Sequence, residues 1–368
     1  MVFKPSDLGS GAISHLANLI LRQYGVVVAL AVLLIAMSMG SPSFLTLKNL
    51  LNILSQWTPV GIMAIGATYV IIAGGFDLSA AAGFALCAVV MASLASNGAP
   101  PALSILAALA VGILVGLMNA LVVVGLRVNP FMATLGTALI LSGVPNVFVD
   151  HTYIIVQQPG FDALGTGSWL GISYAVMCLV LFLVVSGIVL AKTPYGQWIY
   201  AVGGNAEVSR LFGIRVRSVV ASTYVLSGFC MGAAAAISTS HLSYSASEQD
   251  PALIFNVIVS VVIGGTSLSG GFGSIWRTAA GLAILASLQN GLNLLEVDTI
   301  AQYVVKGLII IGALGFDVWT RRLRASSKQR SLLDRSDPTD VGQLNLSAAE
   351  RLPLASQGSS GPEVAIDA

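Results

Sequence analysis

The chain has 368 residues, of which 17 are lysine or arginine and 16 are aspartate or glutamate. Soluble domains carry roughly 25% charged residues, so a chain with 9% charged and 56% hydrophobic residues is not a water-soluble globule. The formal net charge of +1 gives no basic field that would attract nucleic acid.

The composition divides the chain into three parts, and its apolar stretches predict an all-α polytopic membrane protein. Residues 1–22 are typical of a polar cytoplasmic leader, residues 23–320 of a transmembrane domain, and residues 321–368 of a disordered cytoplasmic tail. A helix crosses the bilayer with about 20 apolar residues, which predicts about ten spans. In chain order these are about Gly25 to Gly40, Thr58 to Gly74, two spans between Leu78 and Leu126 that separate at residues 97–101, Phe131 to Phe148, Trp169 to Leu190, Val219 to Thr239, Leu253 to Ile263, Ile275 to Leu294 and Thr299 to Phe316.

The basic residues indicate the orientation of these spans. If both termini are cytoplasmic, 15 of the 17 lysines and arginines fall on the inner side, as the positive-inside rule requires. Lys48 falls outside, and Lys306 lies within the last span. The sequence therefore predicts an even number of spans with the N-terminus and the C-terminus in the cytoplasm.

The second predicted span ends in a glycine pair, Gly74 and Gly75, which Asp77 follows. Glycines let the backbone leave helical geometry at membrane depth where protein or water satisfies the freed groups. An acid beside a membrane helix must be paired, capping or facing water. Asp77 is interpreted either as part of a helix break that shapes the transport pathway or as the N-cap of the next helix.

Three residues at the entry to the fifth span form a weaker candidate for substrate contact. Asn129 and Phe131, with Thr134 about one turn later, would present polar groups and an aromatic face. Sugars suit this combination because their C–H faces pack on aromatic rings while their hydroxyls need hydrogen-bond partners. The alternative is a helix that simply begins at Pro130.

The longest predicted inner loop runs from Lys192 to Arg217 and is basic. Within it, residues 205–212 are expected to form a short helix with Asn205 as the N-cap and Gly213 as the C-cap. Without further information this loop could be a plain connector.

A second glycine pair, Gly264 and Gly265, begins a segment whose sequence is similar to that of the first break. Residues 74–79 read GGFDLS and residues 264–269 read GGTSLS, and each segment is followed by an asparagine, Asn119 or Asn290. Repeated halves with glycine-broken helices indicate a transport site. The distances to the asparagines differ, and a chance similarity between Gly- and Ala-rich helices is the alternative.

Five ordered stretches, together with Asp317, give the chain a more specific resemblance. They are Tyr69 to Ser79, Asn129 to Gly136, Thr193 to Ile214, Gly264 to Gly273, and Asn290 to Gly307. With these stretches the sequence resembles the permease subunit of ribose, xylose and arabinose-type ABC importers, the binding-protein-dependent monosaccharide transport family.

The resemblance implies how such a permease works in the bacterial inner membrane. Two permease copies, identical or different, would form the pore, a separate ATPase subunit would bind ATP, and a periplasmic binding protein would deliver the sugar. This chain would itself carry no cofactor. The resemblance also implies that the basic inner loop is an ATPase-coupling loop. Replacement of Gly204 or Asn205 in this loop is expected to uncouple ATP hydrolysis from transport. The coupling residues are Gly203, Gly204, Asn205, Glu207, Arg210 and Gly213.

Two other classes of function are alternatives to an importer permease. An ion-coupled secondary transporter of a small polar solute could use the two glycine breaks as a midplane site. An enzyme would need convergent catalytic groups, but the three histidines lie apart and no Gly-Lys-Ser/Thr phosphate loop occurs. The three cysteines, each within an apolar run, form neither a metal site nor a disulfide framework.

Overall fold

The computed structural model describes residues 25–149, 153–246, 252–308 and 311–312. The predicted leader, the predicted tail and Asp317 lie outside these residues. The chain divides into two units, residues 1–310 and 311–368, and every element named below belongs to the first.

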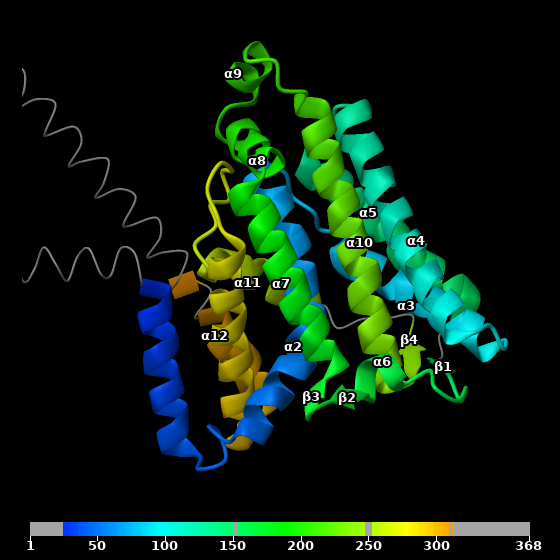
Figure 1. The fold of residues 1–368 in the computed structure, drawn as a ribbon, viewed down its shortest axis with the longest axis vertical. Coiled ribbons are helices and arrows are strands. Elements are labelled where there is room, and N and C mark those ends of the chain that lie inside the picture. The colour runs from blue at the N-terminus through cyan, green and yellow to red at the C-terminus, as the bar shows by residue number, and fades with distance from the viewer. Residues whose placement is uncertain (1–24, 150–152, 247–251, 309–310, 313–368) are drawn as a thin grey trace, which may run out of the picture. The chain divides into compact units, whose positions relative to one another are not determined.

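Helices make up most of the described chain, as predicted (Figure 1). Five of them are long and apolar enough to cross a membrane, namely α2, α4 together with η1, α5, α7 and α10, and three shorter ones are also apolar. These helices agree with a polytopic membrane protein. The helices are Gly25–Gly40, α2 (Leu47–Ile72), α3 (Ala80–Ser96), α4 (Pro101–Ala120), the π-helix η1 (Leu121–Gly125), α5 (Pro130–Val149), α6 (Ala163–Thr166), α7 (Tyr174–Lys192), α8 (Pro194–Gly204), α9 (Ala206–Leu211), α10 (Val216–Leu242), α11 (Ala252–Ile263), α12 (Ile275–Leu294) and residues 299–308.

Four short strands correct the prediction of an exclusively helical chain. Strand β1 (Tyr153–Ile155) pairs antiparallel with β4 (Tyr244–Ala246), and β2 (Ser168–Trp169) pairs with β3 (Ile172–Ser173). The turn between β2 and β3 has φ of 51° at Leu170 and 81° at Gly171, as a two-residue hairpin turn of type I′ requires. Trp169, the predicted start of the sixth span, therefore lies in a strand.

Two further differences concern helix starts. Helix α2 begins at Leu47, well before the predicted Thr58, because the Thr46 hydroxyl caps it by accepting the N–H of Asn49 at 3.3 Å. Hydropathy missed these first turns because they are polar. Helix α8 was not predicted at all, although Thr193 at its N-cap and Pro194 at its first position are ordinary start signals.

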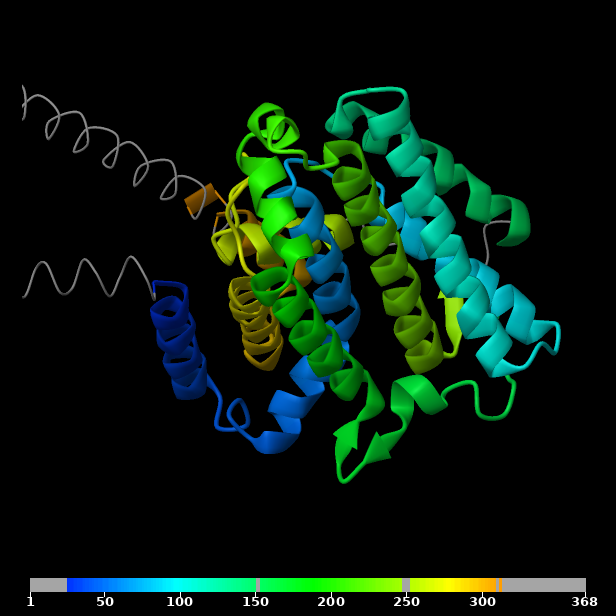
Figure 2. The same ribbon diagram turned by 45° about the horizontal axis from the view of Figure 1, so that its top comes forward.

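Helices α4 and α10 pack with their backbones in close contact (Figures 1 and 2). Gly112 and Gly116 of α4 face Gly228 and Gly232 of α10, two small-x-x-x-small pairs. A methyl group on Gly232 would lie 2.6 Å from the carbonyl oxygen of Ala108, and one on Gly228 would overlap that of Gly112. This contact brings polar side chains of α4 and α10 to the end of α2.

Candidate functional site

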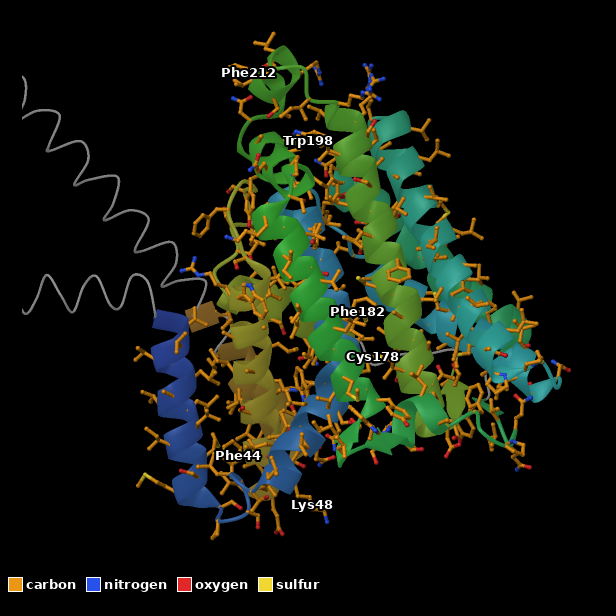
Figure 3. All side chains as sticks on the ribbon, in the orientation of Figure 1. Phe44, Lys48, Cys178, Phe182, Trp198 and Phe212 are labelled. Atoms are coloured by element: carbon orange, nitrogen blue, oxygen red, sulfur yellow. The ribbon has the colours of Figure 1, made fainter. Side chains whose placement is uncertain are left out.

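The predicted ATPase-coupling loop and the strands lie at opposite ends of the helical bundle. Helices α8 and α9 lie at one end with the start of α10, and α6 with the four strands lies at the other (Figures 1 and 2). Trp198 and Phe212 mark the first end, and Lys48 lies at the second (Figure 3). The predicted inner and outer sides require such a separation, and which end faces the cytoplasm stays a prediction.

The first glycine break is a regular helix end rather than an unwound span. Gly74 has φ of +85°, which favours glycine, and its N–H bonds to the carbonyl of Ile71 at 3.0 Å. The N–H of Gly75 reaches back to the carbonyl of Val70 at 2.9 Å, which completes a Schellman motif. The chain then runs without helix through residues 75–78 to Ser79, and α3 begins at Ala80.

Asp77 lies at the centre of a buried polar cluster, with 6% of its surface exposed. Its Oδ1 accepts the Ser79 hydroxyl at 2.6 Å and the Ser79 N–H at 3.1 Å, and its Oδ2 accepts the hydroxyl of Ser227 on α10 at 2.8 Å. The Asn119 amide of α4 donates to the Ser79 Oγ at 2.7 Å. The N-cap interpretation is wrong, because Ser79 occupies the cap position of α3.

Helices α5 and α10 hold the backbone of the same break. The Thr134 hydroxyl, fully buried, accepts the N–H of Leu78 at 3.1 Å and bonds to the carbonyl of Pro130 at 2.9 Å. The Tyr224 hydroxyl donates to the carbonyl of Phe76 at 3.0 Å. Residues 76–79 are therefore hydrogen-bonded to α4, α5 and α10.

The entry of α5 combines a helix cap with an exposed aromatic side chain. The Asn129 Oδ1 accepts the N–H of Phe131 at 3.0 Å, so Asn129 caps a helix that begins at Pro130. The Phe131 ring is 49% exposed and lies 6.2 Å, centroid to centroid, from the ring of Phe76. Thus four of the five predicted pathway residues, Asp77, Asn129, Phe131 and Thr134, gather around one break.

Asn290 lies elsewhere. Its amide forms two reciprocal hydrogen bonds with that of Asn49, at 2.8 and 3.1 Å. Asn49 is in the first turn of α2, whereas Asp77 follows the last, and 26 helical residues span roughly 39 Å. The parallel between Asn119 and Asn290 therefore does not extend to their contacts.

The second glycine break has the same local structure in a shifted register. Helix α11 ends at Ile263, and Gly265 with φ of +81° donates its N–H to the carbonyl of Val262 at 2.8 Å. In the first break the left-handed residue is the first glycine of the pair, and here it is the second. Gly264 instead packs on the start of α12, where a methyl group would lie 2.5 Å from the carbonyl oxygen of Arg277.

Glycines join the coupling loop to both breaks, and we call this contact the glycine junction (Gly74, Gly203, Gly204, Gly270 and Gly271). The carbonyl of Ile72, the last residue of α2, accepts the N–H of Gly271 at 2.8 Å. Gly203, near the end of α8, lies directly over that carbonyl. Methyl groups on Gly270 and Gly271 would lie 3.0 Å from the Cα of Gly74 and 2.8 Å from that of Gly204. Sequence reasoning missed Gly270 and Gly271, although both follow the second break within a glycine-rich run.

Helix α9 confirms the predicted short helix of the inner loop. The Asn205 Oδ1 accepts the N–H groups of Glu207 and Val208, both at 3.0 Å. Phe212 takes the C-cap position, and Gly213 follows it with φ of +81° in a Schellman motif. The Glu207 and Arg210 side chains are exposed. Because both of its ends are capped, this segment forms a regular short helix that projects from the bundle.

Comparison with known proteins identifies the family. The family described as "Branched-chain amino acid transport system / permease component" matches residues 49–314. The ribose import permease protein RbsC of Bacillus subtilis is 37% identical, over 81% of this chain and 93% of that protein. The chain belongs to the ABC-importer permease family that includes the ribose and arabinose permeases. This permease is therefore a transport subunit and not an enzyme.

Other relatives of the permease cover a similar length. RbsC of Escherichia coli K12 is 36% identical over 79% of this chain and 92% of that protein. The L-arabinose ABC transporter permease protein AraH of Azospirillum brasilense is 32% identical over 84% of this chain and 91% of that protein. No solved structure matches the permease. The matched region contains both glycine breaks, the Asp77 cluster and the coupling loop.

Proposed function

We propose that this permease carries a pentose or a related monosaccharide across the bacterial inner membrane, with both termini in the cytoplasm. A separate ABC ATPase binds ATP and docks on α8 and α9, and a periplasmic binding protein delivers the sugar. A second permease copy completes the pore. The names of the relatives, which are ribose and arabinose permeases, support the choice of a pentose.

The observation that carries this proposal is the apolar surface of α9. Leu211 and Phe212 are 84% and 82% exposed, and Val208 is 44% exposed, on a short helix that projects from the end of the bundle. Three apolar side chains gathered on a capped projection indicate a protein interface rather than a plain connector. The neighbouring Glu207 and Arg210 would orient a partner through ion pairs.

The residues around the first break have separate proposed roles. Phe131, exposed at the entry of α5, offers an aromatic face to the sugar, and Asn129 holds it there by capping that helix. Asp77 and Thr134 position the break that the pathway passes. Asn290, paired with Asn49 at the end opposite the coupling loop, would contact solute near the outer entrance.

The ATPase docking is tested by capturing a tagged permease from its native membranes and measuring the bound ATPase by mass spectrometry. We expect an ABC ATPase to copurify, and Phe212→Ser to reduce its recovery about tenfold or more, because buried aromatic side chains dominate interface energies. The matched control is Leu170→Ser, since Leu170 is also 82% exposed but lies on the β2–β3 turn at the other end.

Two results contradict the proposed docking. One is capture of the wild-type permease without any ATPase. The other is equal recovery of the ATPase with Phe212→Ser and with Leu170→Ser, which would place the ATPase on another surface.

A further inference from the structure

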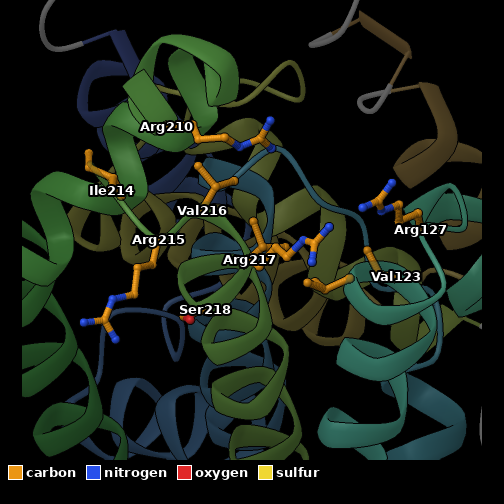
Figure 4. Close-up of a pocket in the computed structure, with 10 residues that line it drawn as sticks. Val123, Arg127, Arg210, Ile214, Arg215, Val216, Arg217 and Ser218 are labelled. Atoms are coloured by element: carbon orange, nitrogen blue, oxygen red, sulfur yellow. The ribbon is translucent and has the colours of Figure 1, made fainter. Parts of the chain in front are cut away.

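A cavity of about 870 Å³ opens beside the coupling loop, between η1 and the segment that links α9 to α10 (Figure 4). Of the side chains proposed above for ATPase docking, Leu211 and Phe212 do not line it, whereas Arg210 does. Its lining residues are Val123, Val124, Arg127, Arg210, Ile214, Arg215, Val216, Arg217, Ser218 and Val220.

Three of the four arginines that line the cavity face a common space. The guanidinium groups of Arg127 and Arg217 point toward one another, and that of Arg210 extends from α9 toward the same side (Figure 4). Arg215 points the opposite way. Within the described residues no acidic side chain lines the cavity. Like charges brought together without a counter-charge repel each other, so an anion in this space would be bound favourably.

The start of α10 adds to the attraction for an anion. The cap residue of this 27-residue helix, Arg215, makes no side-chain hydrogen bond to the first turn. The first N–H groups of a helix carry a partial positive charge and are natural donors to a phosphate oxygen. The Ser218 hydroxyl, in the same turn, provides another donor.

The remaining lining is apolar and lies where membrane helices end. Val123 and Val124 belong to η1, the continuation of α4, and Val216 and Val220 belong to the first turns of α10. Both α4 with η1 and α10 are long and apolar enough to span the bilayer. The cavity thus combines cationic donors with an apolar wall at the ends of two candidate membrane spans. Lipid head groups and acyl chains meet at the ends of such spans.

We propose that this cavity binds an anionic phospholipid of the cytoplasmic leaflet. Arg127 and Arg217 hold the phosphate, and the valines contact the glycerol and the first acyl carbons. The assignment rests on the orientation proposed above, with α9 on the cytoplasmic side, and not on the ATPase docking. A bound lipid here would join the end of α4 to the start of α10 beside the coupling loop.

The test measures lipid retention by the purified full-length permease. Native mass spectrometry compares permease incubated with phosphatidylglycerol and with phosphatidylcholine, each of the same acyl chains. We expect retention of phosphatidylglycerol only, and a loss of about twentyfold or more in the double variant Arg127→Gln/Arg217→Gln, because each basic residue near the surface contributes about fivefold. Arg215→Gln is the matched control and should retain the lipid, since its side chain points away.

Four results overturn the proposal. Equal retention of both lipids, or equal retention by the double variant and Arg215→Gln, would show that the arginines select no anionic lipid. Displacement of phosphatidylglycerol by millimolar inorganic phosphate alone would show a site for free phosphate. Loss of the copurifying ATPase in the double variant without loss of lipid would assign the arginines to the ATPase interface. Copurification measured in the same samples separates failure of the lipid site from failure of the proposed function.

Discussion

Replacement of Gly203 by alanine is expected to reduce ATP-driven uptake at least about tenfold, whereas the same change at Gly204 is expected to leave uptake within about twofold. A methyl group on Gly203 would overlap the carbonyl oxygen of Ile72 and lie 2.6 Å from the nitrogen of Gly271. A methyl group on Gly204 would meet nothing within 4 Å. The open space around Gly204 leads us to expect a smaller effect there than at Gly203, and the coupling role of Gly204 stays a prediction.

The size of the effect at Gly203 follows from the atoms involved. Both neighbours of the added methyl are backbone atoms, which cannot rotate away as a side chain can. The end of α8 must then shift from the end of α2, and the 2.8 Å bond from Gly271 to Ile72 would lengthen or break. We expect ATP hydrolysis to continue in the captured complex, because α9 and its caps are unchanged. Sugar uptake would no longer be coupled to that hydrolysis.

The measurement is uptake and ATP hydrolysis side by side in vesicles containing the captured complex. Tyr200→Phe is a second test variant that adds no bulk, so a loss of uptake in it cannot come from overpacking. It removes only the hydroxyl that donates to the carbonyl of Gly273 at 2.8 Å. A severalfold loss of uptake with unchanged hydrolysis is expected for it. Equal behaviour of the Gly203 and Gly204 variants, together with normal uptake by Tyr200→Phe, would exclude the glycine junction as the coupling contact.

Replacement of Asp77 by alanine is expected to lower the free energy of unfolding by about 3 kcal/mol or more and to abolish uptake. The carboxylate accepts hydrogen bonds from the buried hydroxyls of Ser79 and Ser227, and both donors would lose a partner in a protein interior. Each unpaired buried donor costs about 1–3 kcal/mol. Ser227→Ala removes one donor only, and a loss of about 1 kcal/mol is expected.

Detergent-titration unfolding of the purified variants measures this effect. Asp162→Ala serves as the control, because Asp162 is an exposed aspartate at the N-cap position of α6 whose side chain makes no capping hydrogen bond. Stability of Asp77→Ala equal to that of Asp162→Ala, with normal uptake, would mean that the Asp77 cluster neither holds the break nor contributes to transport.

The features predicted correctly from the sequence depend on short stretches of chain. Apolar runs predicted the membrane helices. Asn205 and Gly213 predicted the two ends of α9, because capping needs only residues within one or two turns. The position of Gly74 at a helix end follows from the same local logic. The short strands were missed because two or three residues carry no periodicity that can be read.

The partners of the site residues could not be predicted, because they depend on tertiary packing. Asp77 meets Ser227 across 150 residues of chain, and that contact exists because the glycines of α4 and α10 let their backbones approach. The sequence did not predict helix α8 because its glycines lower the helix propensity. One of them, Gly203, is needed because only glycine fits over the carbonyl of Ile72. The shifted register of the second break is likewise visible only in its hydrogen bonds.

Whether a separate ATPase drives this permease through α8 and α9 is measured by uptake of labelled ribose and L-arabinose in vesicles that contain the captured complex and the binding protein. We expect uptake of at least one pentose that requires ATP at the α9 side and continues when an ionophore removes the proton and sodium gradients. Uptake that proceeds without ATP and stops when those gradients are removed would contradict it.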